Sequence, residues 1–478
     1  MAFTPTVTST EPQSEVSGPD RHDWLVLGVA LSASVMAIFD LFVVNVAMPH
    51  IRDRLQAGDA AVQLVVSGYA FAYAAGLITG GRLGDRFGYR RMFAVGMASF
   101  TMASLLCSLA QSPTELVVAR IGQGLTAAVM VPQVLSLITV TFSPEHRGRA
   151  TAWYGVATGV AALAAQICGG LLVDWNVAGL DWRVIFLINV PIGVVATALA
   201  LRLLPGTPGG TARLDPTGAV AVTLVMALVL VPLALGRDSG WAPWVWICLV
   251  GAAVAAPATV RWQATVAGAG GEPIIDTRLF TNRSYALLLT ACSLFQLYFG
   301  CFMFTLSLLL QAGLGESATQ ASVVFVCQGV LFTATSLRSG RWAARHGPRV
   351  PLVGATLVVA GLIWLSAVLT RGEPETGQLM AALGVVGAGN GLLLPALLGG
   401  SLARVRPDQA GAASGALNTA QQFANSLGVT VVGTVFFAVA GARLADARTA
   451  MQVVVAIDVV LVLALVPLVR TGWPRQSS

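Results

Sequence analysis

Long apolar runs recur along almost the whole chain, and they constrain its fold more than any other feature. Each run is long enough to cross about 30 Å of membrane hydrocarbon as an α-helix. Charged residues make up only 10% of the 478 residues, whereas about 25% is usual in soluble domains. The sequence therefore predicts an all-α membrane protein. Its fourteen predicted spans are 24–48, 60–80, 92–111, 115–140, 150–173, 183–204, 216–236, 243–262, 284–310, 319–338, 350–370, 377–400, 411–440 and 449–469.

The distribution of basic residues supports this count and predicts an orientation. All 28 basic residues are arginine, and with a cytoplasmic N-terminus the cytoplasmic segments hold 20 of them and the external loops hold seven. The remaining one, Arg120, lies within a span. Basic residues are enriched in the cytoplasmic loops of membrane proteins. We therefore expect both termini in the cytoplasm and the chain in the lipid bilayer of a bacterial cytoplasmic (inner) membrane.

The residue types that the chain lacks exclude several kinds of chemistry. Without lysine there is neither a phosphate-binding loop ending in Gly-Lys-Ser/Thr nor a Schiff-base nucleophile. The four histidines form no HExxH pair. We expect no enzymatic activity, no metal, no cofactor and no nucleic-acid partner. The cysteines lie in apolar runs without metal-ligand spacing and are expected to be buried, inert thiols: Cys107, Cys168, Cys248, Cys292, Cys301 and Cys327.

Short motifs repeat at a nearly constant distance and indicate two related halves. Residues 81–90 match residues 340–349 at two glycines and all three arginines, an offset of 259, and residues 122–124 match 389–391 at both glycines at an offset of 267. Six-helix halves in the same orientation describe the major facilitator transporters, with the substrate between the halves. The predicted domains are a disordered cytoplasmic tail (1–23), an N-terminal six-helix bundle (24–204), a linker with two additional helices (205–283), a C-terminal six-helix bundle (284–470) and a cytoplasmic tail (471–478).

Five longer motifs carry a resemblance to a specific family. They are 40–49 in the first span, 81–91 between the second and third, 120–124 in the fourth, 182–193, and 275–280. Taken together and in this order, they resemble the fourteen-helix drug:proton antiporter family of the major facilitator superfamily. The resemblance implies the major facilitator fold, two six-helix bundles plus two extra central helices. It also implies proton-coupled export by alternating access.

The fifth span departs from the family pattern at one position. Gln166 stands where the antiporter motif has a proline, whereas Gly169 and Gly170 match its glycines. The glycines permit close helix packing, but the kink that a proline would introduce is lost. This departure leaves the direction of transport open.

Ionisable residues inside the spans are candidates for proton coupling, because a charge near the bilayer centre costs at least ~2.5–3.5 kcal/mol. Asp40 and Arg120 lie at similar depths and are expected to pair across a cavity. The functional interpretation is a proton switch, and the alternative is a fixed buried salt bridge. Asp458, in the last span, has no basic residue at its depth in the second half. It carries a second proton, attracts a cationic drug, or is a protonated acid bonded to a neighbouring helix.

The segment between the second and third spans has its own predicted role. By resemblance, Asp85, Arg86 and Arg90, with Gly81 and Gly88 allowing a tight turn, form a cytoplasmic latch that holds one conformation. The alternative is that the arginines only keep this segment on the cytoplasmic side of the membrane.

Polar and aromatic side chains on otherwise apolar spans are candidates for lining a substrate cavity. Each one alone can serve as an interhelical hydrogen bond, but as a set they suit a large cavity for bulky amphipathic compounds. The set is Asn45, Tyr73, Gln133, Gln166, Asn189, Gln296, Tyr298, Gln328, Asn390, Asn418 and Gln421.

The leading hypothesis is a proton-coupled exporter of hydrophobic or amphipathic drugs or of an antibiotic natural product. Its partners are protons, a small amphipathic substrate and the lipid bilayer, and we expect a monomer. The alternatives are an importer or facilitator of a small solute and a membrane sensor that transports nothing.

Overall fold

The computed structural model describes residues 20–176, 179–210, 215–269, 271, 273–371, 374–406, 409–441, 444 and 446–473. These residues are mostly helical and include no β-strand. Most of the predicted tail at 1–23, and the end of the tail at 471–478, lie outside the described residues. The helices are α1 (Arg21–Leu55), α2 (Asp59–Phe87), α3 (Tyr89–Leu109), α4 (Pro113–Thr141), α5 (Pro144–Asp174), η2 (Asp181–Arg183), α6 (Val184–Leu187), α7 (Asn189–Leu203), α8 (Pro216–Leu235), α9 (Pro243–Gly268), η3 (Thr277–Thr281), α10 (Arg283–Leu308), η4 (Leu309–Gly313), α11 (Ala318–His346), α12 (Arg349–Thr370), α13 (Thr376–Leu402), α14 (Ala410–Ala440) and α15 (Ala447–Gly472).

The number of predicted spans is confirmed. Within the described part of the chain, fourteen helical segments are long and apolar enough to cross a membrane. The sixth span, predicted as one continuous helix, is built from η2, α6 and α7 with a break at Ile188. Pro191 has no N–H for the carbonyl of Leu187, which explains why the regular helix is interrupted there.

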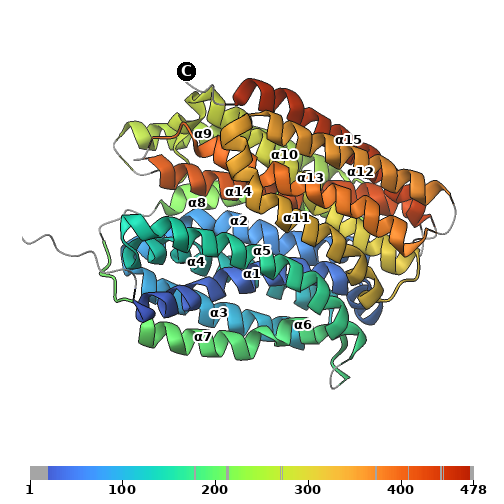
Figure 1. The fold of residues 1–478 in the computed structure, drawn as a ribbon, viewed down its shortest axis with the longest axis horizontal. Helices are drawn as coiled ribbons and strands as arrows, with labels where there is room; N and C mark the ends of the chain where they lie inside the picture. Colours follow the sequence, from blue (N-terminus) through green and yellow to red (C-terminus); the bar gives the residue numbers. More distant parts are fainter. Residues whose placement is uncertain are drawn as a thin grey trace, which may run out of the picture.

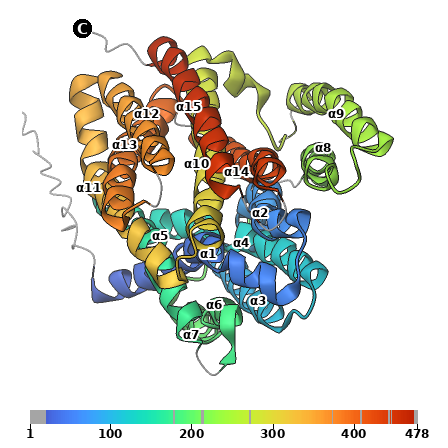
Figure 2. The same ribbon diagram turned by 90° about the vertical axis from the view of Figure 1, so that its right-hand side faces the viewer.

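The helices form two bundles, with the pair α8 and α9 at one side (Figures 1 and 2). Helices α1 to α7 make the first bundle and α10 to α15 make the second. Helix α8 packs on α2 and α14, one helix from each bundle, and α9 packs on α8 (Figure 2). The two additional helices therefore cover one edge of the interface between the bundles.

The bundles meet through α2 with α14, α5 with α11, and α1 with α10 and α11. We call the end at which α1 begins and α15 ends the arginine-rich end, and the other the opposite end. In the described residues, the side-chain hydrogen bonds between the bundles lie toward the opposite end. They join Ser307 to Asn45, Gln311 to Val46, Thr319 to Asp174, Ser426 to Ser67 and Thr434 to Gln63. The structure is therefore held closed at the opposite end.

The segment 81–91, predicted as a loop, is mostly helical. Helix α2 continues to Phe87, Gly88 adopts a φ of 92°, and α3 begins at Tyr89. A positive φ favours glycine, which has no Cβ to clash with the backbone. Gly88 thus makes the tight turn that the sequence predicted, but it does so as a single-residue connection.

Candidate functional site

Asp40 and Arg120 form an ion pair inside the first bundle. Asp40 comes from α1 and Arg120 from α4, and Arg120 Nη1 donates to Asp40 Oδ2. Both side chains are 0% exposed. The predicted pairing is confirmed, but its place differs from the prediction. The two residues meet within one bundle and not across a cavity, because α1 and α4 pack directly on each other.

Two amide side chains complete the contacts of the Asp40 carboxylate. Gln123 Nε2 on α4 and Asn189 Nδ2 on α7 each donate to Asp40 Oδ1 at 2.9 Å. Gln123 Nε2 also lies 2.8 Å from Ser104 Oγ on α3. The carboxylate thus accepts hydrogen bonds from two other helices, α4 and α7, and Arg120 balances its charge. This is what a charge buried in an apolar bundle requires.

Arg120 links this cluster to α2. Its Nε donates to the carbonyl of Val65 at 3.1 Å, and its guanidinium carbon lies 4.3 Å from the centre of the Tyr69 ring. Its Nη2 has no partner in the described residues. Helix α2 also packs on α14, so Arg120 contacts a helix that lies at the interface between the bundles.

This arrangement allows a proton on Asp40 to take the place of the ion pair with Arg120. When Asp40 takes up a proton, the attraction to Arg120 is lost, whereas the guanidinium keeps its charge. An unpaired charge in the bundle interior is strongly unfavourable. In the neutralised cluster Arg120 therefore needs a new partner or water.

A second buried acid lies in the other bundle. Asp458 on α15 is 0% exposed, and its Oδ1 accepts a hydrogen bond from Cys301 Sγ on α10 at 3.2 Å. Beside it, Tyr298 Oη donates to Asn390 Oδ1 at 3.3 Å. Asp458 Oδ2 and Asn390 Nδ2 have no partner in the described residues. The ion pairs between described residues do not include Asp458.

The two clusters occupy equivalent places in the two halves. Asp40, Gln123 and Asn189 correspond to Cys301, Asn390 and Asp458 at offsets of 261, 267 and 269 residues. In both clusters the side chain on the first helix bonds the side chain on the last helix of its bundle. The acid is therefore on the first helix of the first bundle (Asp40 on α1) but on the last helix of the second bundle (Asp458 on α15).

The arginine has no equivalent in the second half. At an offset of 267, Gly387 takes the place of Arg120, and a Cβ there would collide with the carbonyl of Gln328. Close packing of α13 on α11 thus occupies the space that a cation would need. Among the described residues no side-chain cation balances the charge of Asp458, so a bound proton or an external cation is left as its partner.

Four of the predicted cavity residues lie inside the bundles and bind protein groups. Asn189, Tyr298 and Asn390 belong to the two clusters, and Gln133 Nε2 donates to the carbonyls of Gly80 and Val129 at 2.8 Å. The remaining seven come from helices that form the interface between the bundles. They are Asn45 on α1, Tyr73 on α2, Gln166 on α5, Gln296 on α10, Gln328 on α11, and Asn418 and Gln421 on α14. Two of them also contact groups of their own bundle, since Gln328 Nε2 lies 4.0 Å from Met303 Sδ and Gln421 Nε2 donates to the carbonyl of Leu417 at 3.3 Å.

The residues of the predicted latch contact neighbouring groups of the first bundle. The Asp85 carboxylate accepts from the Tyr89 hydroxyl at 2.8 Å, and Arg90 donates to the carbonyl of Leu201. The chain after α7 also crosses this turn. Thr207 Oγ1 accepts from the Tyr89 N–H, and the carbonyl of Asp85 accepts from the N–H of Gly210, each at 2.8 Å. In this structure the motif is thus bonded to its own bundle and to the segment that leads to α8.

The two glycines of the fifth span permit close packing, as predicted. A Cβ on Gly169 would press against Val43 and Val46 of α1, and one on Gly170 would collide with Ser322 and the Ala318 carbonyl of α11. Gly169 therefore faces its own bundle, and Gly170 faces the other one.

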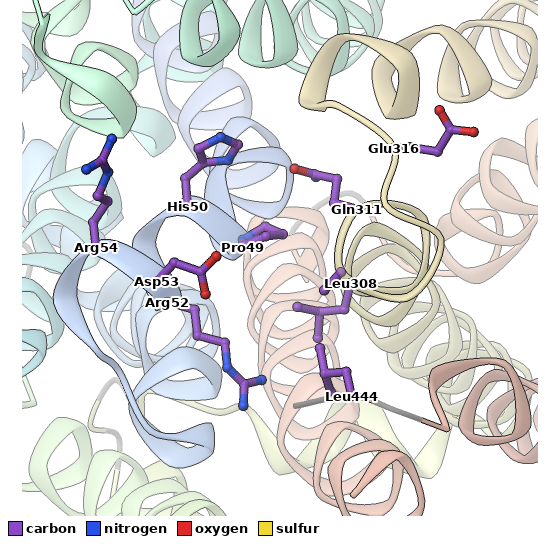
Figure 3. A pocket seen from close by; sticks show the side chains of 10 residues that line it. Pro49, His50, Arg52, Asp53, Arg54, Leu308, Gln311, Glu316 and Leu444 are labelled. Atoms are coloured by element: carbon purple, nitrogen blue, oxygen red, sulfur yellow. The ribbon is translucent and has the colours of Figure 1, made fainter. Parts of the chain in front are cut away.

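A pocket of about 550 Å³ opens at the opposite end, between the ends of α1 and α10. Figure 3 shows Gln311 reaching from its turn toward Pro49 and His50. The pocket is lined by Pro49, His50, Arg52, Asp53, Arg54, Leu308, Gln311, Ala312, Glu316 and Leu444.

Sequence reasoning missed several residues of this site. Ser104, Ser307 and Gln311 carried no signal beyond being polar on apolar helices. Cys301 was expected to be inert, but the internal repeat could have identified it, since it lies 261 residues after Asp40. The pocket is formed by segments far apart in sequence, which no local pattern brings together.

Comparisons with known proteins agree with this architecture. The family model for the Major Facilitator Superfamily matches residues 30–429. The chain is similar to the probable actinorhodin transporter of Streptomyces coelicolor, with 36% identity over 90% of this chain and 76% of the relative. It is also similar to the cephamycin export protein CmcT of Amycolatopsis lactamdurans, with 34% identity over 86% and 84%. The puromycin resistance protein pur8 of Streptomyces alboniger is 34% identical over 94% and 89%.

Solved structures show the same fold at much lower identity. A bacterial homolog of the human lysosomal transporter Spinster, in an inward-facing and occupied conformation, has a TM-score of 0.71 and 16% identity, covering 96% of this chain and 100% of that one. An auto-inhibited POT family peptide transporter has a TM-score of 0.68 and 17% identity, covering 93% and 96%.

Proposed function

The chain belongs to the Major Facilitator Superfamily, and from this premise we propose that it exports small hydrophobic or amphipathic compounds in exchange for protons. We further propose that it lies in a bacterial cytoplasmic membrane with the arginine-rich end and both termini in the cytoplasm. The named export and resistance roles of its relatives support the direction of transport. The excess of arginine at one end supports the orientation.

The observation that carries the proton coupling is the fully buried pair of Asp40 and Arg120. The pair ties α1 to α4 and, through Val65, to α2. Two of these helices, α1 and α2, also contact the second bundle. Protonation of Asp40 therefore alters contacts on helices that have to move when the bundles rock against each other.

Because the opposite end is closed, we assign the structure to the state of the transport cycle in which the substrate site is shut off from that end. In the described residues the hydrogen bonds between the bundles lie toward that end, and we propose that the substrate path of this state opens toward the arginine-rich, cytoplasmic end. A substrate enters between the bundles, where the seven interface residues offer scattered polar anchors among apolar side chains. Proton uptake by Asp40 from outside and its release inside then drive the return of the transporter.

Export can be tested with ethidium as the probe in energised cells that express the chain. We expect lower ethidium accumulation than in cells with the empty vector, and we expect a protonophore to abolish the difference. If accumulation is unchanged, or rises, broad export of amphipathic cations is wrong for this chain. A rise that depends on the proton gradient would instead indicate import.

We propose that Asp458 is a second protonatable site, whose partner is a proton because no cation among the described residues pairs with it. Replacing it with asparagine keeps the volume and removes no counter-ion, so we expect the free energy of unfolding to change by no more than about 1 kcal/mol. The number of protons moved per substrate is expected to fall. Thermal unfolding and proton-to-substrate ratios in proteoliposomes measure the two effects. An unchanged ratio would assign Asp458 a purely structural role.

A further inference from the structure

Pro49 lies inside α1, near the opposite end, and removes one hydrogen bond from that helix. In a regular α-helix the N–H of residue 49 would bond the carbonyl of Asn45, but proline has no N–H to donate. A backbone carbonyl in a membrane-spanning helix needs another donor, because lipid offers none. The structure shows which donor this is.

The donor comes from the other bundle. Ser307 on α10 is fully buried, and its Oγ donates to the carbonyl of Asn45 at 2.6 Å. One turn later, Gln311 Nε2 donates to the carbonyl of Val46 at 2.8 Å and lies 3.1 Å from Ser307 Oγ. We call the contact of Asn45 and Val46 with Ser307 and Gln311 the α1–α10 clasp.

The clasp stands at the boundary between the closed interface and the pocket. Gln311 belongs to the π-helical turn Leu309–Gly313 and lines the pocket together with Pro49 (Figure 3). The pocket also holds charged side chains and opens outward, so water reaches the pocket side of Gln311, whereas the bond between Ser307 and the Asn45 carbonyl is buried while this end is closed. When the bundles separate at this end, water can replace Ser307 as the donor to the Asn45 carbonyl, and the bond is exchanged rather than lost.

We propose that the α1–α10 clasp is the gate that keeps the opposite end closed, and that Pro49 makes it necessary by leaving the Asn45 carbonyl without a partner in its own helix. The gate would open and close once in each cycle. This inference rests on the proposed alternating-access function. Ser307 and Gln311 are positioning residues in it, since they act on the bundles and not on the substrate.

The clasp predicts a specific pattern among variants. Ser307→Ala leaves the Asn45 carbonyl orphaned only while the opposite end is closed, so the ratio of open to closed molecules should rise about ten-fold. Ser307→Thr keeps a hydroxyl donor and should restore the ratio. Adding Pro49→Ala to Ser307→Ala supplies a backbone N–H to Asn45, so the double variant should also return toward the wild-type ratio.

A matched control lies on the same helix. The hydroxyl of Thr305 is fully buried but bonds only carbonyls of α10, Cys301 at 2.8 Å and Phe302 at 3.4 Å. Thr305→Val therefore removes a buried hydroxyl without touching the clasp, and the ratio should stay as in the wild type.

The ratio can be measured by double electron–electron resonance in proteoliposomes. Spin labels at Gln111→Cys and Arg371→Cys, both exposed at the opposite end and one in each bundle, report the separation. Cys168, Cys248 and Cys327, the cysteines that are only partly buried, are first replaced by alanine.

Three outcomes are distinguishable. A larger long-distance population in Ser307→Ala, reversed by Pro49→Ala, supports the clasp. If short- and long-distance molecules are both present, but their ratio is the same in Ser307→Ala and Thr305→Val, the clasp is not the gate. Alternating access would still stand in that case. A single distance in every variant would overturn both the clasp and the proposed cycle.

Discussion

Replacing Asp40 with asparagine is expected to abolish proton-coupled export and to destabilise the first bundle. The variant leaves Arg120 charged and buried without a counter-ion, which costs about 3–5 kcal/mol. The new amide also places a donor where Gln123 and Asn189 donate. We expect ethidium export to fall to the level of the empty vector and the midpoint of thermal unfolding to drop.

Two further variants separate loss of stability from loss of coupling. Asp40→Asn combined with Arg120→Gln removes both charges, so stability should largely return while export stays absent. Asp59→Asn removes the acid of the partly exposed ion pairs with Arg52 and Arg237. Such pairs contribute about 0–1 kcal/mol, so this control should export normally. Wild-type export by either variant that lacks Asp40 would show that Asp40 does not carry the coupling.

Replacing Gly170 with leucine is expected to eliminate export by a different route. Gly170 lies against the Ala318 carbonyl of the other bundle, where even a Cβ does not fit. The fold of each bundle should survive, because the added side chain points away from the bundle that Gly170 belongs to. Overpacking costs about 1–3 kcal/mol, and here it penalises only the state that is closed at the opposite end.

The same helix offers a control for this variant. Gly159 is also on α5, and a Cβ there would meet nothing within 4 Å. Gly159→Leu should therefore retain export, while both variants should purify as monodisperse protein of similar thermal stability. If Gly170→Leu exports as well as Gly159→Leu, then the close approach of α5 and α11 is not needed during the cycle.

The parts of the fold that follow from hydrophobic length and repeat distance could be predicted from the sequence. The fourteen spans and the pairing of Asp40 with Arg120 needed only helix geometry and the cost of a buried charge. The break at Ile188 was also visible in principle, since Pro191 stands one turn after Leu187.

The contacts between distant helices could not be predicted in the same way. Pro49 shows that the Asn45 carbonyl needs a donor, but nothing local indicates that Ser307, 262 residues away, supplies it. The partner of Asp458 is a similar case. The sequence shows an acid without a cation, whereas the bond to Cys301 depends on how α15 packs against α10.

Proton movement coupled to substrate is the most direct test of the proposed function. Everted membrane vesicles that respire acidify their interior, and acridine orange fluorescence reports the gradient. Adding ethidium should cause an immediate partial recovery of the fluorescence in vesicles with the wild-type chain, because each substrate that enters releases protons from the interior. Vesicles with Asp40→Asn should show none. Ethidium transport without any fluorescence change, or an equal recovery in the Asp40→Asn vesicles, would contradict proton exchange through Asp40.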